Sequence, residues 1–485
     1  MLKEERQSNI RNSIFESAHA LLNILSSSVG PKGLDKMLIK QNKTTVTNDG
    51  ATILKFFTDN PIHLFLSNVS NAQVEKCGDG TTSVIILTCS LLNSLKKLID
   101  MNIHPSIICD HLEKARNIAI DYIEWVKIPN NNLNIFNTVI TTLNSKVVGN
   151  AVEMANASIK AMEAVNYEKN KIRILKKLGG SIDDVQFYNG MLFDSNFKTE
   201  KRTVKCALIQ FCISAPKTNM DSKILVDNPL LMEHIISDER KYILEICKKI
   251  KMTGCQLLII QKSILRDSLS ELGRHFLKKL NILVLESVDR KEIENISAAL
   301  NIEPVSDINL FSTENLKEVE IQNTRDFLEI KGFGSSIVLN GCDDLILDEV
   351  ERSLNDALCV VNCMHEENFI VPGGGAIEIA ISKKILESDE GNIFINREIS
   401  KGFESIPYFL ARNAGHNPVE AVSELRNIIK DEPTYGVSVR GHNINDMLED
   451  DNVVQPVSIT KSVVNLAIET VSYMLKIDDI LPSRT

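Results

Sequence analysis

Hydrophobic positions recur at helical spacing through the first hundred residues. They predict a helix over Ile10–Ser27 that ends at the VGPKG break of Val29–Gly33. KTTVT at Lys43–Thr47 alternates Thr and Val, which predicts a short strand before an Asn-Asp-Gly turn. Two further helices begin at NDGATILKFF and GDGTTSVIIL. The second carries an apolar stripe that marks its core face: Val84, Leu87, Leu91, Leu95 and Leu98.

Strands appear in the middle of the chain. QLLIIQ (Gln256–Gln261) and NILVLES (Asn281–Ser287) are compact apolar runs, and the segment between them has helical periodicity. A strand, helix and strand in this order favour a β-α-β unit with a parallel pair. The apolar positions of the intervening helix are Leu265, Leu269, Leu272, Phe276 and Leu280.

A long helix is predicted upstream, from about Pro229 to Thr253, with proline in its first turn and Gly254 after its end. Its front half is apolar, and such a face is either buried by neighbours or exposed for a partner. Burial is favoured because most apolar helical faces lie in a core. The apolar residues concerned are Leu230, Leu231, Met232, Ile235 and Ile236.

A strongly amphipathic helix is predicted over Asp348–Glu367, followed by a glycine turn in VPGGGAIEIAI and another helix. Asp356 falls roughly 120° from the apolar stripe of this helix, so we expect it to face solvent or a neighbouring domain. The residues predicted on the core side are Val350, Leu354, Ala357 and Val361.

Composition indicates an ordinary globular protein of roughly two to four domains. The chain has 485 residues, of which 43% are hydrophobic and 24% charged, and its formal net charge is −10. An acidic balance argues against a nucleic-acid partner or an anionic membrane surface. The charged start lacks the apolar region of a signal peptide, and no run approaches the ~18 apolar residues of a membrane span.

The ten cysteines are scattered and form no CxxC pair. Buried free thiols in a reducing compartment, by default the cytosol, are the favoured interpretation. Cys359 and Cys363 lie one helical turn apart, and helix-face spacing explains this more simply than a metal site.

The P-loop, Rossmann, zinc-protease and α/β-hydrolase motifs are all absent from the sequence. The candidates that remain for a chemical site are glycine-rich turns. The turns are VGPKG, NDGAT, GDGTTS and PGGGA. Helix N-termini bind phosphate through free N–H groups, and Thr81, Thr82 and Ser83 add hydroxyl donors.

Asp79 is unexpected in such a turn, because a carboxylate and a phosphate repel each other. A Mg²⁺ ion that binds oxygens of both would resolve the conflict, which makes Asp79 a candidate metal ligand. Asp49 and Asp356 are then candidates to orient an attacking water and accept its proton. The alternative is structural: a turn with a helix cap at each Asp-Gly, and a solvated charge at Asp356. Spacing alone leaves both interpretations open.

Longer segments resemble the group II chaperonins, in that family's order and over essentially the whole chain. The resemblance implies a multidomain α and α/β chaperonin fold. Its helical equatorial domain, at 1–130 and 371–485, would bind ATP. A small α/β intermediate domain would comprise 131–197 and 337–370, and an α/β apical domain with a helical protrusion, at 198–336, would bind clients. The segments are SSVGPKGLDKML, VTNDGATILK, GDGTTSVIIL, TTLNSKVV, VERSLNDAL, VPGGGAIEIA and ETVSYMLKIDDI.

Segments that vary among paralogues resemble one subunit type of the eukaryotic cytosolic complex, CCT/TRiC. The resemblance implies an ATP-driven chaperone subunit in stacked eight-membered rings of paralogous subunits, with unfolded clients such as actin and tubulin. The apolar helix near Ile235 would then belong to the built-in lid and face a partner when the ring is open. The strand at Lys43–Thr47 would join a sheet shared with the neighbouring subunit. The varying segments are ILKKLGGSIDD, LIQFCISAPKTNMD, KKIKMTGCQLLIIQKSILRDSLSEL and VVQPVSI.

The family's ATP chemistry also maps onto this sequence. The resemblance implies three catalytic aspartates, Asp49, Asp79 and Asp356, with Asp79 holding Mg²⁺ and the other two positioning and activating water. Gln455 stands where many relatives have an acidic residue near the ribose, so we expect altered affinity with binding retained. The implied nucleotide-binding residues are Gly30, Gly33, Gly80, Thr81, Thr82, Ser83, Asn144, Ser145, Lys146, Gly374 and Gln455.

In the family layout, Asp356 lies in the intermediate domain while Asp49 and Asp79 are equatorial. Hydrolysis would therefore be coupled to domain closure. Two other classes of function explain less of the sequence. A small-molecule ATPase or kinase would leave the apical segments unexplained, and the three aspartates argue against a subunit that only assembles.

Overall fold

The computed structural model describes residues 2–40, 43–57, 60–130, 132–146, 150–194, 201–214, 229–263, 267–324, 327–332, 334–388, 391–429, 433–441 and 443–480. The chain forms two compact units. The first, called here the helical unit, comprises Met1–Ile159, Lys176–Val185 and Leu339–Thr485; the second, the sheet unit, comprises Lys160–Leu175 and Gln186–Val338. The predicted three-domain division, with its boundaries, stays a prediction.

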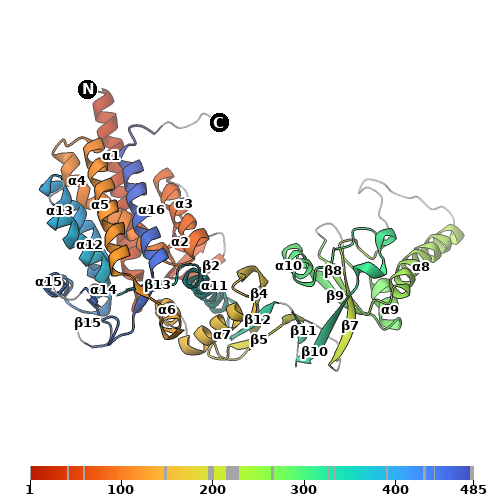
Figure 1. The fold of residues 1–485 in the computed structure, drawn as a ribbon. Helices are drawn as coiled ribbons and strands as arrows, with labels where there is room; N and C mark the ends of the chain where they lie inside the picture. The colour runs from red at the N-terminus through yellow and green to blue at the C-terminus, as the bar shows by residue number, and fades with distance from the viewer. Residues whose placement is uncertain are drawn as a thin grey trace. The chain divides into compact units, whose positions relative to one another are not determined.

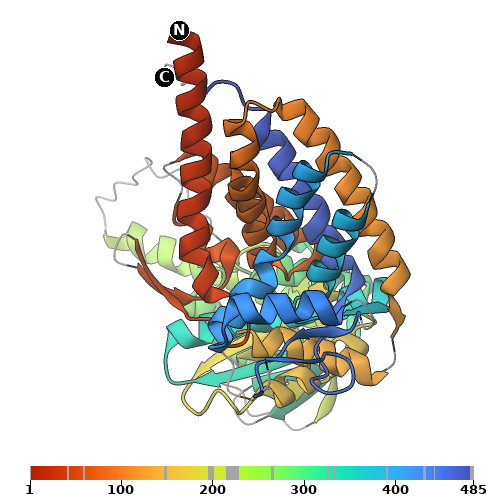
Figure 2. The same cartoon turned by 90° about the vertical axis from the view of Figure 1, so that its left-hand side faces the viewer.

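Long helices from both ends of the chain pack together in the helical unit (Figure 1). The helix α4 (Thr81–Asp100) is central and packs against α1 (Leu2–Leu25), α13 (Ile393–Phe403) and α16 (Val457–Leu475). Figure 2 shows these helices side by side. The remaining long helices of this bundle are α3 (Pro61–Cys77), α5 (Pro105–Val126), α12 (Ala376–Glu387), α14 (Ser405–Ala414) and α15 (Pro418–Ile428).

The apolar stripe predicted for α4 is buried along its whole length, from Val84 to Leu98. Among the described helices, α4 alone is long and apolar enough to cross a membrane by length and composition, and most of that window is buried inside the unit. Burial among neighbouring helices accounts for its apolar character, because a core helix must be apolar on nearly every face.

Short strands of the helical unit position loops. The hairpin of β1 (Lys36–Lys40) and β2 (Lys43–Thr47) confirms the strand predicted from KTTVT. A second sheet has the order β16-β13-β3, and β14 pairs with β15. The bounds of these strands are β3 Ile128–Pro129, β13 Phe369–Pro372, β14 Tyr435–Val437, β15 Ile444–Asp446 and β16 Val454–Pro456.

Three further helices complete the frame around these loops: α2 (Gly50–Leu54), α6 (Asn132–Asn144) and α11 (Asp344–Glu366). The helix α7 (Ala151–Ala164) begins in the helical unit, and the 3₁₀ turn η1 (Ser26–Ser28) follows α1. The core side predicted for α11 is confirmed, since its four predicted residues are almost fully buried: Val350, Leu354, Ala357 and Val361.

A six-stranded sheet with the order β6-β11-β10-β7-β8-β9 forms the sheet unit. The predicted β-α-β unit is confirmed, because β8 and β9 are parallel and α9 (Glu271–Lys279) lies between them in the chain. Leu265, predicted for that helix, lies outside the described residues. The strand bounds are β6 Met191–Asp194, β7 Arg202–Ile209, β8 Leu257–Gln261, β9 Leu283–Val288, β10 Lys317–Thr324 and β11 Phe327–Lys331.

The chain crosses between the two units at four points: within α7, within β4 (Ile172–Leu178), before β5 (Gln186–Tyr188) and within β12 (Ser335–Gly341). The strands β4, β12 and β5 form a small sheet. The helix α10 (Arg290–Leu300) packs on one side of the large sheet. Short 3₁₀ turns occur at η2 (Lys169–Lys171), η3 (Ile308–Leu310) and η4 (Thr313–Asn315).

The long helix α8 (Pro229–Met252) has two different halves. Its rear half buries Ile243 and Ile250 in the core beside the sheet. Its front half projects beyond the sheet (Figure 1) and leaves Met232 58%, Ile235 45% and Ile236 41% exposed. The burial predicted from the apolar pattern is therefore wrong for these three side chains, because no described segment covers them. The side chains of Leu230 and Leu231 lie outside the description.

All ten cysteines are free thiols, and seven of them are buried. No group of three His, Cys, Asp or Glu side chains that could hold a metal occurs in the part of the chain that the structure describes. Cys359 and Cys363 both lie on α11, one helical turn apart.

Candidate active site

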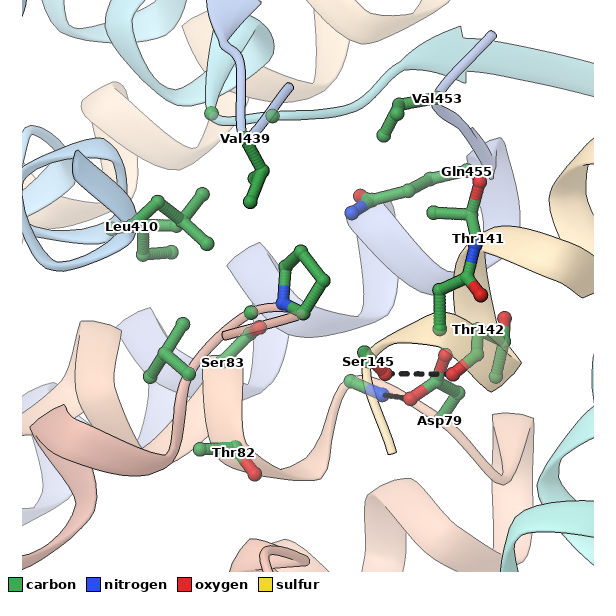
Figure 3. A pocket seen from close by; sticks show the side chains of 18 of the residues that line it. Asp79, Thr82, Ser83, Thr141, Thr142, Ser145, Leu410, Val439, Val453 and Gln455 are labelled. Carbon is green, nitrogen blue, oxygen red and sulfur yellow. Dashed lines mark hydrogen bonds between the residues drawn. The ribbon is translucent and has the colours of Figure 1, made fainter. Parts of the chain in front are cut away.

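Loops from both ends of the chain enclose a cavity of about 510 Å³ in the helical unit (Figure 3). Its walls come from the turn after η1, the starts of α2 and α4, the end of α6, the turn after β13, and the strands β14 and β16. This volume lies within the usual range for a site that binds a small molecule or cofactor.

The start of α4 forms one wall. Gly80 caps the helix with φ 82°, and a Cβ at this position would lie 3.0 Å from Ile459 and 3.1 Å from Val463. Glycine is needed here for its left-handed backbone and because α16 approaches closely. Thr81, Thr82 and Ser83 follow and line the cavity. The first N–H groups of a helix have no partner within it, so this wall is suited to an anion.

Asp79 is held by the same turn. Its Oδ1 accepts a hydrogen bond from the Gly80 N–H at 2.7 Å, and its carbonyl oxygen accepts one from Gln73 Nε2 at 2.8 Å. Figure 3 shows the Asp79 side chain near Ser145 and Thr142 at the base of the cavity.

Asp49 caps α2, and both oxygens of its carboxylate accept hydrogen bonds. Its carboxylate accepts hydrogen bonds from the Thr52 N–H at 3.0 Å, the Thr52 hydroxyl at 2.8 Å and the Thr81 hydroxyl at 2.8 Å. Burial would raise the pKa of Asp49, but the charge of Lys146 and the threonine hydrogen bonds together lower it below its usual value. Asp49 is therefore a fixed, ionised acceptor at neutral pH.

Lys146 forms an ion pair with Asp356 of α11, and their side chains are 9% and 17% exposed. Burial opposes the charged form of Lys146, but Asp356, Asp79 and Asp49 outweigh it and raise the pKa of this lysine. Burial, reinforced by Asp79 and Asp49 and opposed by Lys146, raises the pKa of Asp356 to about 7. Asp356 is therefore largely shielded from solvent, so the first alternative from the helix pattern is wrong. The second, that it faces a neighbouring domain, stays a prediction; Asp356 lies in the same compact unit as Asp49 and Asp79.

Three carboxylates and one lysine leave the base of the cavity with an excess of negative charge, so a further cation fits there. Mg²⁺ is usually held by one or two carboxylates together with phosphate oxygens and water. Asp79 can supply one such carboxylate, since only its Oδ1 is used by Gly80. The donor set thus fits a Mg²⁺ ion that arrives with a phosphate, whereas the described side chains do not form a cage for an isolated metal.

The far end of the cavity is more apolar. Leu410, Val439 and Val453 surround the Gln455 side chain there (Figure 3). Gln455 lies on β16 opposite Val371 of β13, the strand that leads into the triple glycine. Apolar side chains interspersed with polar ones are suited to a flat heterocycle and a sugar hydroxyl.

Gly374 lies beside this apolar end, with φ 64°. A Cβ here would lie 2.6 Å from the Met447 sulfur, so the turn requires glycine. The Gly374 carbonyl accepts a hydrogen bond from the Val437 N–H at 2.9 Å, which joins the turn to β14.

The first glycine turn is also tightly built. Gly30 has φ 80°, and a Cβ on it would lie 2.6 Å from Leu410. The Gly33 N–H donates to the Gly30 carbonyl at 2.9 Å, so Gly33 closes the turn without lining the cavity. Asn413 of α14 fixes the segment before this turn by donating hydrogen bonds to the carbonyls of Ser26 and Val29.

The structure thus brings most of the predicted site residues to one cavity. Of these residues, only Gly33 and Asp356 are not in its lining, and Asp356 is connected to the lining by its ion pair with Lys146. The predicted residues that line it are Gly30, Asp49, Asp79, Gly80, Thr81, Thr82, Ser83, Asn144, Ser145, Lys146, Gly374 and Gln455.

Several lining residues were not predicted. Asn48 donates to the Ser145 carbonyl at 3.0 Å and so ties the turn before α2 to the end of α6. Asn48 could have been predicted as a site residue, because it directly precedes the candidate Asp49. Glu378 lines the cavity from the first turn of α12, and burial raises its pKa. Neither Glu378 nor Arg440 belongs to a glycine turn, so no pattern in the sequence indicated them.

A helical frame, glycine turns at helix starts, and acids beside an anion site are suited to binding a nucleotide. The TCP-1/cpn60 chaperonin family matches residues 21–485, and the chain belongs to this family. It is similar to "T-complex protein 1 subunit delta" of Encephalitozoon cuniculi (strain GB-M1), with 55% identity over 480 residues, 99% of each chain. The proteins of the same name from Homo sapiens and Arabidopsis thaliana are each 38% identical, over 99% of this chain and 95% and 96% of theirs. The varying segments resemble this delta type, and the predicted resemblance to one subunit type is thereby confirmed.

Proposed function

We propose that this chain binds Mg-ATP in the cavity of the helical unit and hydrolyses it as one subunit of a hetero-oligomeric chaperonin ring in the cytoplasm. The arrangement of Asp49, Lys146 and Asp356 around the start of α4 carries the proposal. Membership of the chaperonin family supports nucleotide binding in general. The geometry of the cavity supports the roles proposed below for particular residues.

The start of α4 would hold the phosphates through its free N–H groups and the hydroxyls of Thr81, Thr82 and Ser83. Asp79 would hold the metal, which supplies charge neutralisation and orients the phosphates when bound. Lys146 adds a second positive charge at the same end of the cavity. Gln455 and the turn at Gly374 would bind the ribose and base.

Asp49 is suited to orient the attacking water, because its hydrogen bonds to Thr52 and Thr81 fix it in its charged form. Asp356 is suited to accept the proton, because its pKa of about 7 is that of an efficient general base near neutral pH. Lys146 lines the cavity and pairs with Asp356, which lies outside the lining. The predicted coupling of hydrolysis to domain closure and a built-in lid stays a prediction.

The ring assembly rests on the relatives, whose name describes each as a subunit of a larger complex. We propose stacked eight-membered rings of paralogous subunits, with unfolded proteins such as actin and tubulin as clients. Two exposed apolar surfaces support the proposal that this chain binds partners. One is on β1, where Met37 is 67% and Ile39 71% exposed, and the other is the front half of α8. A small-molecule kinase would use neither surface.

Replacing Asp356 by alanine tests the catalytic assignment. We expect nucleotide affinity in the presence of Mg²⁺ to stay within about threefold, and ATP turnover to fall about 100-fold or more, the usual contribution of a general base. Steady-state hydrolysis and equilibrium binding of ADP measure the two effects.

Asp348→Ala is the matched control, since Asp348 lies on the same helix and its exposed carboxylate pairs with Lys176. Normal turnover in Asp356→Ala would remove Asp356 from the catalytic set. A wild-type chain that binds no ADP would refute the proposed function itself.

A further inference from the structure

Gln73 lies in the interior of the helical unit, one turn before the end of α3, and connects three elements. Its side chain is fully buried. Its Nε2 donates to the Asp79 carbonyl at 2.8 Å, and its Oε1 accepts from the Ser462 hydroxyl of α16 at 2.7 Å. Ser462 is fully buried as well. Both ends of the amide are therefore used, and the helix α16 holds it in one orientation.

The Asp79 carbonyl and the Gly80 N–H belong to the same planar peptide group. A hydrogen bond that fixes the carbonyl oxygen therefore also fixes the direction of that N–H. This N–H donates to Asp79 Oδ1 at 2.7 Å and so sets the orientation of the carboxylate. Gln73 thus acts on the Asp79 side chain through the backbone.

The peptide between Asp79 and Gly80 needs such a restraint. Gly80 has φ 82°, and glycine readily adopts backbone angles on either side of zero. A peptide with glycine on one side can reverse its orientation at small cost, which would turn the N–H away from Oδ1. Close packing also places Gln73 at this peptide, since a Cβ on Gly80 would lie 3.3 Å from Gln73 Nε2.

We infer that Gln73, backed by Ser462, is a positioning residue for the Asp79 metal ligand: it holds the Asp79–Gly80 peptide so that Oδ1 is occupied and Oδ2 is presented to a divalent cation. The inference rests on the proposed function, because it assumes that Asp79 binds the metal of a metal–nucleotide complex. Residues that orient metal ligands typically change metal affinity by about 10–100-fold when they are replaced.

Gln73→Met tests this inference, because methionine is similar in length and makes neither hydrogen bond. The probe is Mn²⁺ with ADP on the purified full-length chain, followed by electron paramagnetic resonance. We expect Mn²⁺ affinity in the presence of ADP to fall about tenfold. ADP affinity in EDTA should stay within about twofold, since the helix start and hydroxyls that contact phosphate remain. Amide hydrogen exchange in the segment 78–84 should become faster.

Two further variants separate positioning from general damage. Ser462→Ala removes only the backing hydroxyl and should lower Mn²⁺ affinity about threefold, which keeps the inference testable if Gln73→Met does not fold. Thr88→Val deletes a buried hydroxyl of α4 that bonds within its own helix, so it should leave both affinities unchanged.

Unchanged Mn²⁺ affinity in both Gln73→Met and Ser462→Ala would overturn the inference. Equal losses of Mn²⁺ and metal-free ADP affinity would overturn it too, because they would indicate structural damage. A wild-type chain that binds neither Mn²⁺ nor ADP would refute the proposed function, and the inference with it.

Discussion

The turn before α4 and the front half of α8 represent opposite ways of using a helix start. In the turn at Gly78–Gly80, the carboxylate and the carbonyl of Asp79 each have a defined hydrogen-bond partner, and neighbouring side chains pack closely against Gly80. In the front half of α8, Met232, Ile235 and Ile236 are exposed and no described residue covers them. One region is fixed by contacts within the chain; the other is left for a contact outside it.

This difference matches the ligands proposed for the two regions. A phosphate and its metal require groups held within fractions of an ångström, so the turn is restrained from several sides. An unfolded client has no fixed shape, so a surface that meets it gains from apolar area and needs no fixed geometry. The same chain therefore combines a rigid site in the helical unit with an open apolar surface in the sheet unit.

The largest effect is expected from the rigid region. Asp79→Ala removes the only charged side chain assigned to the metal, and Mg²⁺ affinity in the presence of ADP should fall about 100-fold or more. Isothermal titration of ADP at increasing Mg²⁺ measures this directly.

Asp79→Asn serves as the matched variant, because its amide oxygen can still accept from the Gly80 N–H while the charge is lost. A comparable loss in both variants would assign the effect to charge. Retained Mg²⁺ dependence in Asp79→Ala would refute the metal role.

A smaller effect is expected from the pH dependence of stability. The pKa of Asp356 is about 7 in the folded chain and returns to the ordinary aspartate value of 3.8 when unfolding exposes the residue. A raised pKa stabilises the folded state fully below about pH 4, and this stabilisation is lost as the pH rises through 7. Urea unfolding of the nucleotide-free chain between pH 5 and 8 should show a decline on the order of 2 kcal/mol from this group.

Asp356→Asn should reduce that decline, since asparagine does not titrate in this range. Asp348→Asn, at an exposed position of the same helix, should keep the decline of the wild type. An unchanged decline in Asp356→Asn would show that this carboxyl is not the group responsible.

The site could be predicted in large part from the sequence because its requirements are local. Glycines with positive φ, hydroxyls at a helix start and an acid before them are all visible within a few residues, as in GDGTTS. Gln73 and Glu378 could not be predicted in this way, because their roles depend on which distant segments pack against them. The pairing of Lys146 with Asp356 spans 210 positions and is invisible to periodicity.

The fold shows the same limit. Periodicity predicted α4, α8, α11 and the parallel pair of β8 and β9, because each depends on a repeating pattern within one segment. Periodicity gave the wrong environment for Ile235, since an apolar stripe indicates that a surface avoids water but not what covers it. Ile243 and Ile235 belong to the same apolar pattern, yet only Ile243 reaches the sheet.

The smallest effect is expected from that exposed surface, because the proposed client would meet it through many weak contacts. Replacing Met232, Ile235 and Ile236 together by serine should weaken capture of denatured actin roughly tenfold, as apolar area is lost. ATP turnover should remain near wild type, because none of the three lines the cavity.

A matched triple replacement of Glu233, Glu239 and Arg240 by serine changes exposed polar positions of the same helix and should leave capture unchanged. Equal capture by both triple variants would mean that exposure of this half of α8 has another purpose. A loss of turnover in the apolar triple would instead break the contrast between the two regions, by showing that the open surface is coupled to the rigid site.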